Sequence, residues 1–328
     1  MKKFVPLILF AVLSFTMLLF LNTKEVEATS SNSEKNVTSL FKGTLKFEVD
    51  ENKNAKLKKV DLGNEKEQIK QADILASELN HDYLYNYDSS ISGDRVDLFS
   101  NKETKIKNKT KGKVPGYVEV QVETLLSEKN KSITNVIRIT KVVGTKPMYV
   151  NASNNLLANK SVNGKYIRVL AHTKKFMLGE IKAGASSSKS FRVGGTSFYK
   201  REFSASVVWK DSPPVVDSKT SSPFLANEKA VLYPYAKNNH NKKVMPAPAY
   251  ANMKVIPVED REKRDKKIRD KYKSWYIKKY GDPKWNWSDY EIHHIIPLQY
   301  GGNNDMNNLF PLKKDFHRKS VSPWWTGY

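Results

Sequence analysis

The chain has 328 residues, with 56 lysines and arginines against 34 acidic residues, and its formal net charge is +22. It contains no cysteine, which excludes disulfides, thiolate metal sites and cysteine nucleophiles, so that any metal must be held by histidine or oxygen ligands. The length favours two folded domains plus a targeting segment. The charge favours a polyanionic partner such as nucleic acid, an anionic membrane face or an acidic wall polymer.

The first 28 residues have the pattern of a secretory signal peptide. Lys2 and Lys3 precede an uncharged, mostly apolar run from Phe4 to Leu21, and small residues at two of the positions 26–28 suit a signal peptidase. We expect cleavage after Ala28 and a secreted protein without stable membrane association. The alternative is an uncleaved N-terminal membrane anchor, because the run is near the minimum spanning length of about 18 residues.

Residues 29–237 are predicted to form a mainly-β domain, either a sandwich or an open barrel. Val118, Val120 and Val122 alternate with polar residues, as in a half-buried strand. Glycine, asparagine, serine and proline clusters separate these runs. Comparable runs occur at 132–143, 165–171, 203–209 and 230–235, and a capping-box spacing predicts a short helix near 64–79.

No catalytic motif is evident in this β region, and its ligand and role are not indicated. His81, His172 and His240 are isolated from one another and from acidic clusters, which is typical of structural or surface histidines. A segment rich in asparagine, proline and alanine, 238–257, is predicted to be a linker. The domain 258–328 then begins with a predicted helix over 259–279, where apolar and aromatic residues recur at helical spacing.

Three of the six histidines lie close to the C-terminus, at positions 293, 294 and 317. The pattern predicts a strand over 290–295, a tight loop at Gly301 and Gly302, a second strand over 309–312, and a helix from 313 that carries His317. Adjacent histidines on a strand point to opposite faces, so only one of the pair can approach His317. Two imidazoles that hold one divalent ion, with a third free as a base, form a sound hydrolytic arrangement.

Residues 285–320 closely resemble the HNH (His-Asn-His) endonuclease family, which has the ββα-metal fold. The matching stretches are HHIIPL from His293, the glycine pair, NNLFPL, and His317. The resemblance implies that His293 is the first metal ligand and His317 the second. It also implies that His294 is the general base and that Asn308 ties the loop and helps to orient that base. Glu291 recurs in many members and is a candidate to support a ligand.

The resemblance leaves two features open. Colicin-like members carry a further histidine one helical turn beyond the position of His317, and here that position is Val321. The third ligand is therefore open, with water, substrate phosphate or another polar group as the candidates. Histidine ligands admit zinc, magnesium, manganese or nickel, so the identity of the single divalent ion is also open. Four basic residues beside the motif are candidates to bind nucleic-acid phosphates, with a solvated helix face as the alternative: Lys313, Lys314, Arg318 and Lys319.

Taken together, these patterns predict an α+β protein in which a mainly-β domain precedes a small ββα-metal nuclease domain. The expected activity is metal-dependent hydrolysis of phosphodiester bonds with low sequence specificity, in DNA first and RNA as the alternative. Two other interpretations of the function stay open. One is an antibacterial nuclease toxin with a delivery or receptor-binding β domain and a cognate inhibitor protein, and the other is an inactive wall-associated binding protein. We also expect a fragment from about Asn252 onward to fold by itself.

Overall fold

The computed structural model describes residues 37–61 and 116–328. The expectations for the signal peptide, for the helix near 64–79 and for His81 lie outside these residues. Within the described part, two antiparallel sheets precede a small C-terminal region with two helices and a two-stranded sheet. The expectation of a mainly-β region followed by a small mixed region is therefore correct at this level.

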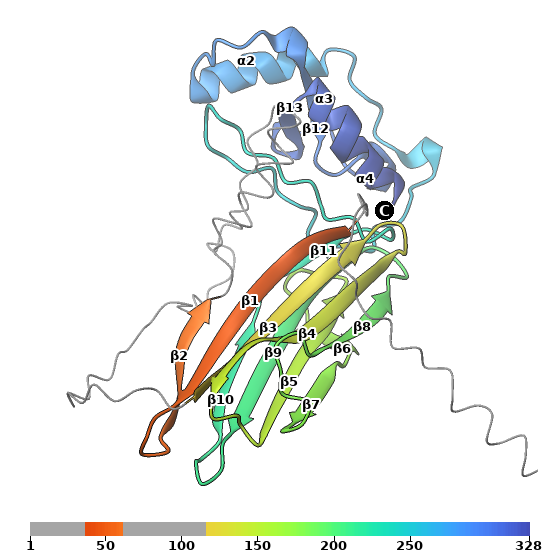
Figure 1. Ribbon diagram of the computed structural model, residues 1–328. Helices are drawn as coiled ribbons and strands as arrows, with labels where there is room; N and C mark the ends of the chain where they lie inside the picture. The colour runs from red at the N-terminus through yellow and green to blue at the C-terminus, as the bar shows by residue number, and fades with distance from the viewer. Residues whose placement is uncertain (1–36, 62–115) are drawn as a thin grey trace, which may run out of the picture. The chain divides into compact units, whose positions relative to one another are not determined.

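The first sheet contains the long strands β1, β3 and β4, which lie side by side in one layer (Figure 1). Within the described residues it has five strands in the order β2-β1-β3-β4-β8, and every neighbouring pair is antiparallel. Their bounds are β1 (Val37–Val49), β2 (Ala55–Asp61), β3 (Gly116–Ser127), β4 (Ser132–Gly144) and β8 (Ser186–Arg192).

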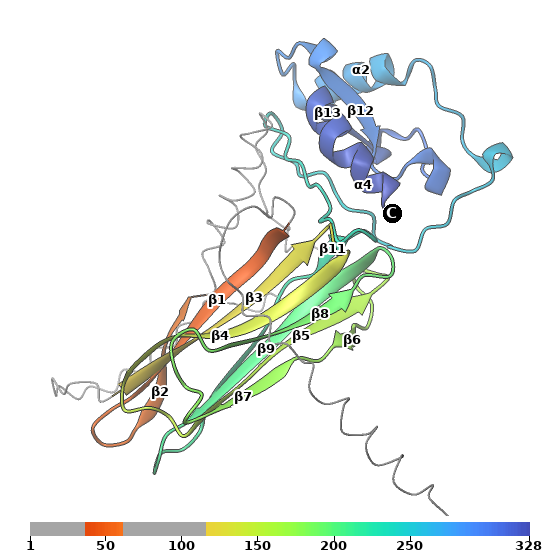
Figure 2. The same ribbon diagram turned by 45° about the vertical axis from the view of Figure 1, so that its right-hand side comes forward.

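The second sheet is built around β5 and β9, which pair along almost their whole lengths. Its main path is β10-β9-β5-β6. In addition, β7 pairs with β5 and β11 pairs with β9, and Figure 2 labels these four strands. Their bounds are β5 (Tyr149–Asn159), β6 (Ile167–Leu170), β7 (Thr173–Met177), β9 (Ser197–Val208), β10 (Val215–Thr220) and β11 (Phe224–Ala226).

The two sheets pack face to face over one apolar core. On β3, Val118, Val120 and Val122 are buried and alternate with half-buried residues, which confirms the period of two predicted from the sequence. Across the core they share a cluster with Val150 of β5 and Phe203 of β9. Because burying a valine or phenylalanine stabilises the fold by about 1.5–3 kcal/mol, this interface provides much of the sandwich's stability.

The chain differs from the sequence-based prediction at 230–235, where no strand forms. Ala230 adopts a left-handed conformation, with φ of 58°, that a strand cannot continue. Pro234 has no N–H to offer to a ladder. The backbone of this segment makes only the isolated bridge between Ala226 and Leu232, so the prediction of one more strand was wrong.

The first helix of the C-terminal region is also shorter than predicted. It is α2 (Ile268–Tyr280), and residues 261–267 before it are irregular. Asp265 explains the late start, because its carboxylate accepts the backbone N–H of Lys267 and its carbonyl accepts that of Ile268. Such local bonding competes with helix and favours a turn or cap.

After α2 come β12 (Tyr290–His294) and β13 (Leu309–Lys313), an antiparallel pair. The chain ends in α3 (Lys314–Phe316), a π-helical turn His317–Val321 and α4 (Ser322–Thr326), which follow one another without a break. Short 3-10 turns lie at Val258–Asp260, Trp287–Asp289, Leu298–Tyr300 and Met306–Asn308. This strand, loop, strand and helix order is the one predicted from the sequence.

The β12–β13 pair is covered on both faces. On one face, Tyr272 and Tyr276 of α2 share a cluster with Leu309. On the other, Phe310 shares a cluster with Trp324 of the last helix and with sandwich residues such as Leu225. The C-terminal region and one end of the sandwich therefore share a hydrophobic core, and the described residues of both belong to one compact unit.

Two hydrogen bonds tie α4 to the segment after β11. The side-chain amide of Asn227 donates to the carbonyl of Trp324 at 2.9 Å, and the indole of Trp324 donates to the carbonyl of Val231 at 3.0 Å.

Across residues 37–61 and 116–328, no helix combines the length and the apolar character needed to cross a membrane.

Candidate metal and catalytic site

The register of β12 separates the two adjacent histidines. His293 lies opposite Phe310 on β13, and His294 lies opposite Leu309. Residues that face each other across antiparallel strands point to the same side of the sheet. His293 therefore points toward the last helix with Phe310, while His294 points toward the α2 side with Leu309.

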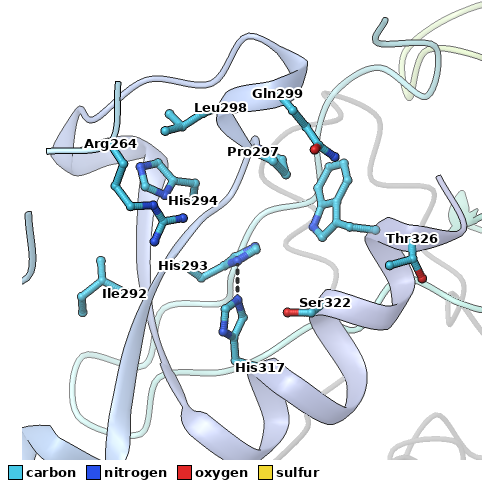
Figure 3. A pocket seen from close by; sticks show the side chains of 11 residues that line it. Arg264, Ile292, His293, His294, Pro297, Leu298, Gln299, His317, Ser322 and Thr326 are labelled. Atoms are coloured by element: carbon cyan, nitrogen blue, oxygen red, sulfur yellow. Dashed lines mark hydrogen bonds between the residues drawn. The ribbon is translucent and has the colours of Figure 1, made fainter. Parts of the chain in front are cut away.

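On the side of the last helix, His293 meets His317. Nδ1 of His293 lies 3.1 Å from Nε2 of His317, and Figure 3 shows the two side chains pointing toward each other. Glu291 accepts the Nδ1 proton of His317 at 2.7 Å. The carboxylate thus favours the tautomer of His317 in which Nε2 bears the lone pair and points at His293.

Burial keeps His293 neutral. Loss of solvent lowers the pKa of His293 to about 3, and the nearby charges of His317, His294 and Arg264 act in the same direction. Burial alone would raise the pKa of Glu291, but the hydrogen bonds from His317 and Arg318 outweigh it and lower that pKa. At neutral pH the pair therefore combines a neutral imidazole on β12 with an imidazole backed by a carboxylate.

The spacing of these two rings suits a shared metal ion. Two nitrogens, each about 2.0–2.1 Å from a tetrahedral zinc ion, lie roughly 3.3 Å apart, close to the observed separation of 3.1 Å. Within the described ranges no group of three or more histidine, aspartate or glutamate side chains could hold a metal. Val321 is fully buried and offers no ligand. An ion at this pair would therefore need solvent or substrate oxygens to complete its coordination.

On the other side of the sheet, His294 bonds to Asn304. Nε2 of His294 lies 3.1 Å from Oδ1 of Asn304, and Nδ1 is buried without a hydrogen-bond partner in the described residues. Burial lowers the pKa of His294, although the hydrogen bond to Asn304 opposes this. His294 is therefore a neutral imidazole with one nitrogen engaged and one nitrogen free.

The loop between β12 and β13 is closed by Asn308. Its Oδ1 accepts the backbone N–H of Ile296 at 2.9 Å, and its Nδ2 donates to the carbonyls of Ile296 and Asn303 at 3.0 and 2.9 Å. Gly302 lies against this knot, because a Cβ there would stand 1.7 Å from the carbonyl oxygen of Ile296. The side chain of Asn308 thus bonds to the loop backbone, and among the described residues no hydrogen bond joins it to His294.

His293, His294 and His317 line one pocket of about 420 Å³. Arg264 enters it from the irregular segment before α2 and lies beside the ring of His294 (Figure 3). Arg264 is exposed, and the structure shows no ion pair for it among the described residues. The pocket thus combines three imidazoles with a guanidinium that has no carboxylate partner in residues 37–61 and 116–328. The remaining lining residues are Ile292, Pro297, Leu298, Gln299, Ser322, Trp325 and Thr326.

The four basic residues predicted to bind phosphates lie outside the lining of this pocket. Arg318 forms a salt bridge with Glu291 at 2.5 Å, and Lys319 forms one with Asp315 at 3.2 Å. Lys313 ends β13 with an exposed side chain, and half-buried Lys314 begins the last helix. Two of the four are therefore already paired with carboxylates of the chain.

No protein-family model, no curated protein and no solved structure matches the chain.

Sequence reasoning missed three residues of the site: Glu262, Arg264 and Asn304. The first two lie in the charged stretch 259–273 of the predicted helix, which the sequence indicates as a solvated face whose lysines and arginines could also contact phosphate. Only the irregular path of 261–267 brings Glu262 to Asn304 and Arg264 to the histidines. Asn304 had a weak signal, since it lies in the same asparagine-rich loop as Asn308.

Proposed function

We propose that the C-terminal region is a metal-dependent endonuclease of the HNH type, with a ββα-metal site, that hydrolyses phosphodiester bonds of nucleic acid. The observation that carries the proposal is the pair His293 and His317, whose ring nitrogens lie 3.1 Å apart. They share one pocket with His294 and Arg264. A ligand pair, a separate base and a cation beside them match what phosphodiester hydrolysis requires.

His293 and His317 would hold one divalent ion, with Glu291 fixing the ring of His317. When bound, such an ion supplies Lewis-acid stabilisation of charge on phosphate oxygens. Neutral imidazoles accept zinc, nickel or manganese, and magnesium with more water ligands, so the proposal does not choose among them.

His294 is the proposed general base. It takes one proton from a water molecule, whose oxygen then forms a bond to phosphorus while the bond from phosphorus to the leaving 3′ oxygen breaks. A base at this position must be neutral before the reaction, and burial favours the neutral form of His294. The guanidinium of Arg264 would bind a non-bridging oxygen of the same phosphate.

DNA is the preferred substrate in this proposal and RNA the alternative, because the large positive charge favours both. Lys313 and Lys314 are better candidates for flanking phosphates than Arg318 and Lys319, which have carboxylate partners. A secreted location rests on the signal pattern of residues 1–28. Scavenging of nucleic acid and attack on competitors are both compatible with that location.

A plasmid digestion assay tests the proposal. The purified chain, stripped with a chelator, should cleave supercoiled DNA only after a divalent ion is added. His294→Ala should lower the cleavage rate by about 10²–10⁴-fold. His240 bonds to Tyr276 and does not line the pocket, so His240→Gln should cleave normally. Absence of cleavage with every ion in a panel of zinc, nickel, manganese and magnesium would overturn it.

A further inference from the structure

Asn304 lies between His294 and a carboxylate from a distant part of the chain. Its side-chain nitrogen donates to Oε1 of Glu262 at 2.6 Å and to the carbonyl of Lys263 at 2.8 Å. Its backbone N–H donates to the same Oε1 at 3.0 Å. Glu262 precedes Asn304 by 42 positions, so this contact joins the segment before α2 to the loop after β12.

These contacts determine which way the amide of Asn304 points. If the amide were flipped, its oxygen would face both the carboxylate of Glu262 and the carbonyl of Lys263, and two acceptors cannot bond to a third. The nitrogen must therefore face Glu262, and Oδ1 must face His294.

The orientation of the amide in turn determines the tautomer of His294. Oδ1 of Asn304 can only accept, so Nε2 of His294 must carry the proton in the bond of 3.1 Å. Nδ1 then bears the lone pair of the neutral ring. This nitrogen has no partner among the described residues, and it is buried beside the pocket that His294 lines. Its lone pair is therefore not engaged, and a water molecule in the pocket reaches it only when the neighbouring side chains move apart.

We propose that Asn304, held by Glu262, is a positioning residue that keeps His294 in the tautomer protonated on Nε2, so that Nδ1 accepts the proton of the attacking water. This inference rests on the proposed function for its catalytic part. The water loses its O–H bond to Nδ1, the ring becomes an imidazolium, and the Nε2 proton stays in its bond to Asn304. The amide oxygen then also stabilises the positive ring.

The tautomer can be measured without any cleavage assay. Histidine labelled with ¹⁵N gives separate ring signals for protonated and unprotonated nitrogens of a neutral imidazole. The signals of His294 in the whole chain are assigned by their loss in His294→Gln. We expect Nε2 to be the protonated nitrogen, and a ring protonated on Nδ1 would overturn the proposal.

Kinetics test the positioning role. Asn304→Ala should lower kcat by about 10–10²-fold, as expected for a partner that orients a catalytic group, with KM and the affinity for Mn²⁺ unchanged. Asn303→Ala is the matched control, since within the described residues the Asn303 side chain bonds only to neighbouring Asp305, and this variant should cleave normally. An unchanged kcat in Asn304→Ala would overturn the proposal.

A double variant at positions 304 and 262 tests whether Glu262 acts on His294 through Asn304 or only stabilises the loop. In Asn304→Asp a new carboxylate faces Glu262, so the loop should be repelled and kcat should fall. Adding Glu262→Gln restores a donor opposite an acceptor and should recover at least about tenfold in kcat relative to Asn304→Asp. No recovery would count against the Glu262–Asn304–His294 connection. A wild-type chain that cleaves nothing would overturn the proposed function and the catalytic part of this inference, while the ring signals would still decide the tautomer.

Discussion

His293 and His317 are 24 positions apart in the chain, yet their nearest ring nitrogens lie 3.1 Å apart. Glu291 accepts a hydrogen bond from the other ring nitrogen of His317. The approach depends on β13, because the register that pairs His293 with Phe310 also sets where the last helix starts. Local geometry over a short stretch of chain therefore determines the distance between the two candidate ligands.

The first prediction concerns metal affinity. The chain should bind one divalent ion, and either His293→Ala or His317→Ala should abolish that binding in calorimetric titration with zinc or nickel. Glu291→Gln keeps a hydrogen-bonding oxygen but removes the charge, so affinity should fall by about 10–100-fold. His240→Gln should bind normally. Wild-type affinity in His317→Ala would show that the pair is not the metal site.

The second prediction concerns Arg264. If its unpaired guanidinium binds the reacting phosphate, Arg264→Ala should slow cleavage by about 10²–10³-fold, the cost typical of losing one donor to developing charge. The slope of log affinity against log salt should also become shallower by about one. Lys182→Ala, in a turn of the sandwich, is the control and should change neither quantity. An unchanged rate and slope in Arg264→Ala would remove Arg264 from the site.

The sequence predicted the histidine set because its geometry is local. A strand, a loop, a second strand and a helix follow one another between Tyr290 and His317, and each carries its own pattern. Alternation in β3 and β4 predicted the buried face of the first sheet for the same reason. In both cases the signal that predicted the structure was the periodicity of residues within one helix or strand.

Contacts that depend on an irregular path could not be predicted. Glu262 and Arg264 reach the pocket only because Asp265 delays α2 until Ile268, and their charged neighbours looked like a solvated helix face. The core shared between Trp324 and the segment after β11 was missed too, since it joins residues 93 positions apart. Long-range packing leaves no period in the sequence.

The third prediction follows from that shared core and reverses the expectation of an independent C-terminal fragment. Trp324 is 1% exposed, and its ring packs edge-on against that of Tyr233 with the ring centroids 4.8 Å apart. Its indole N–H also donates to the carbonyl of Val231. A fragment from Asn252 would leave this surface uncovered, so it should unfold at much lower denaturant than the whole chain. In the whole chain, Trp324→Ala should cost about 3–5 kcal/mol of unfolding free energy.

Half-buried Trp275 provides a matched control for that experiment. Trp275→Ala removes the same side chain from α2 and should cost clearly less than Trp324→Ala in the same urea titration. A fragment from Asn252 as stable as the whole chain would show that the nuclease region folds without the sandwich. That result would favour a releasable domain, as the toxin interpretation requires.

The fourth prediction is a pH dependence of stability that arises in the sandwich. His172 is 4% exposed, its Nε2 lies 3.0 Å from the hydroxyl of Ser187, and its Nδ1 is buried with no partner in the described residues. Burial, and then the charge of Lys189, lower its pKa below the usual 6.5. In the unfolded chain the ring titrates normally, so below pH 6.5 the unfolded state binds more protons than the folded state. Stability from neutral His172 is thus complete above this pH and is lost as the pH falls toward the folded pKa.

In urea titrations, the free energy of unfolding should therefore fall as the pH is lowered from 7.5 to 5.5. Most carboxyl groups titrate below this pH range and contribute little to the change. His172→Gln keeps a group that can bond to Ser187 but cannot become charged, so its stability should depend less on pH over the same range. Some dependence should remain, because the pKa of His293 is also lowered, to about 3. Adding His293→Gln should flatten the profile further. A His172→Gln profile as steep as that of the wild type would mean that His172 accepts a proton in the folded sandwich at no greater cost than in the unfolded chain.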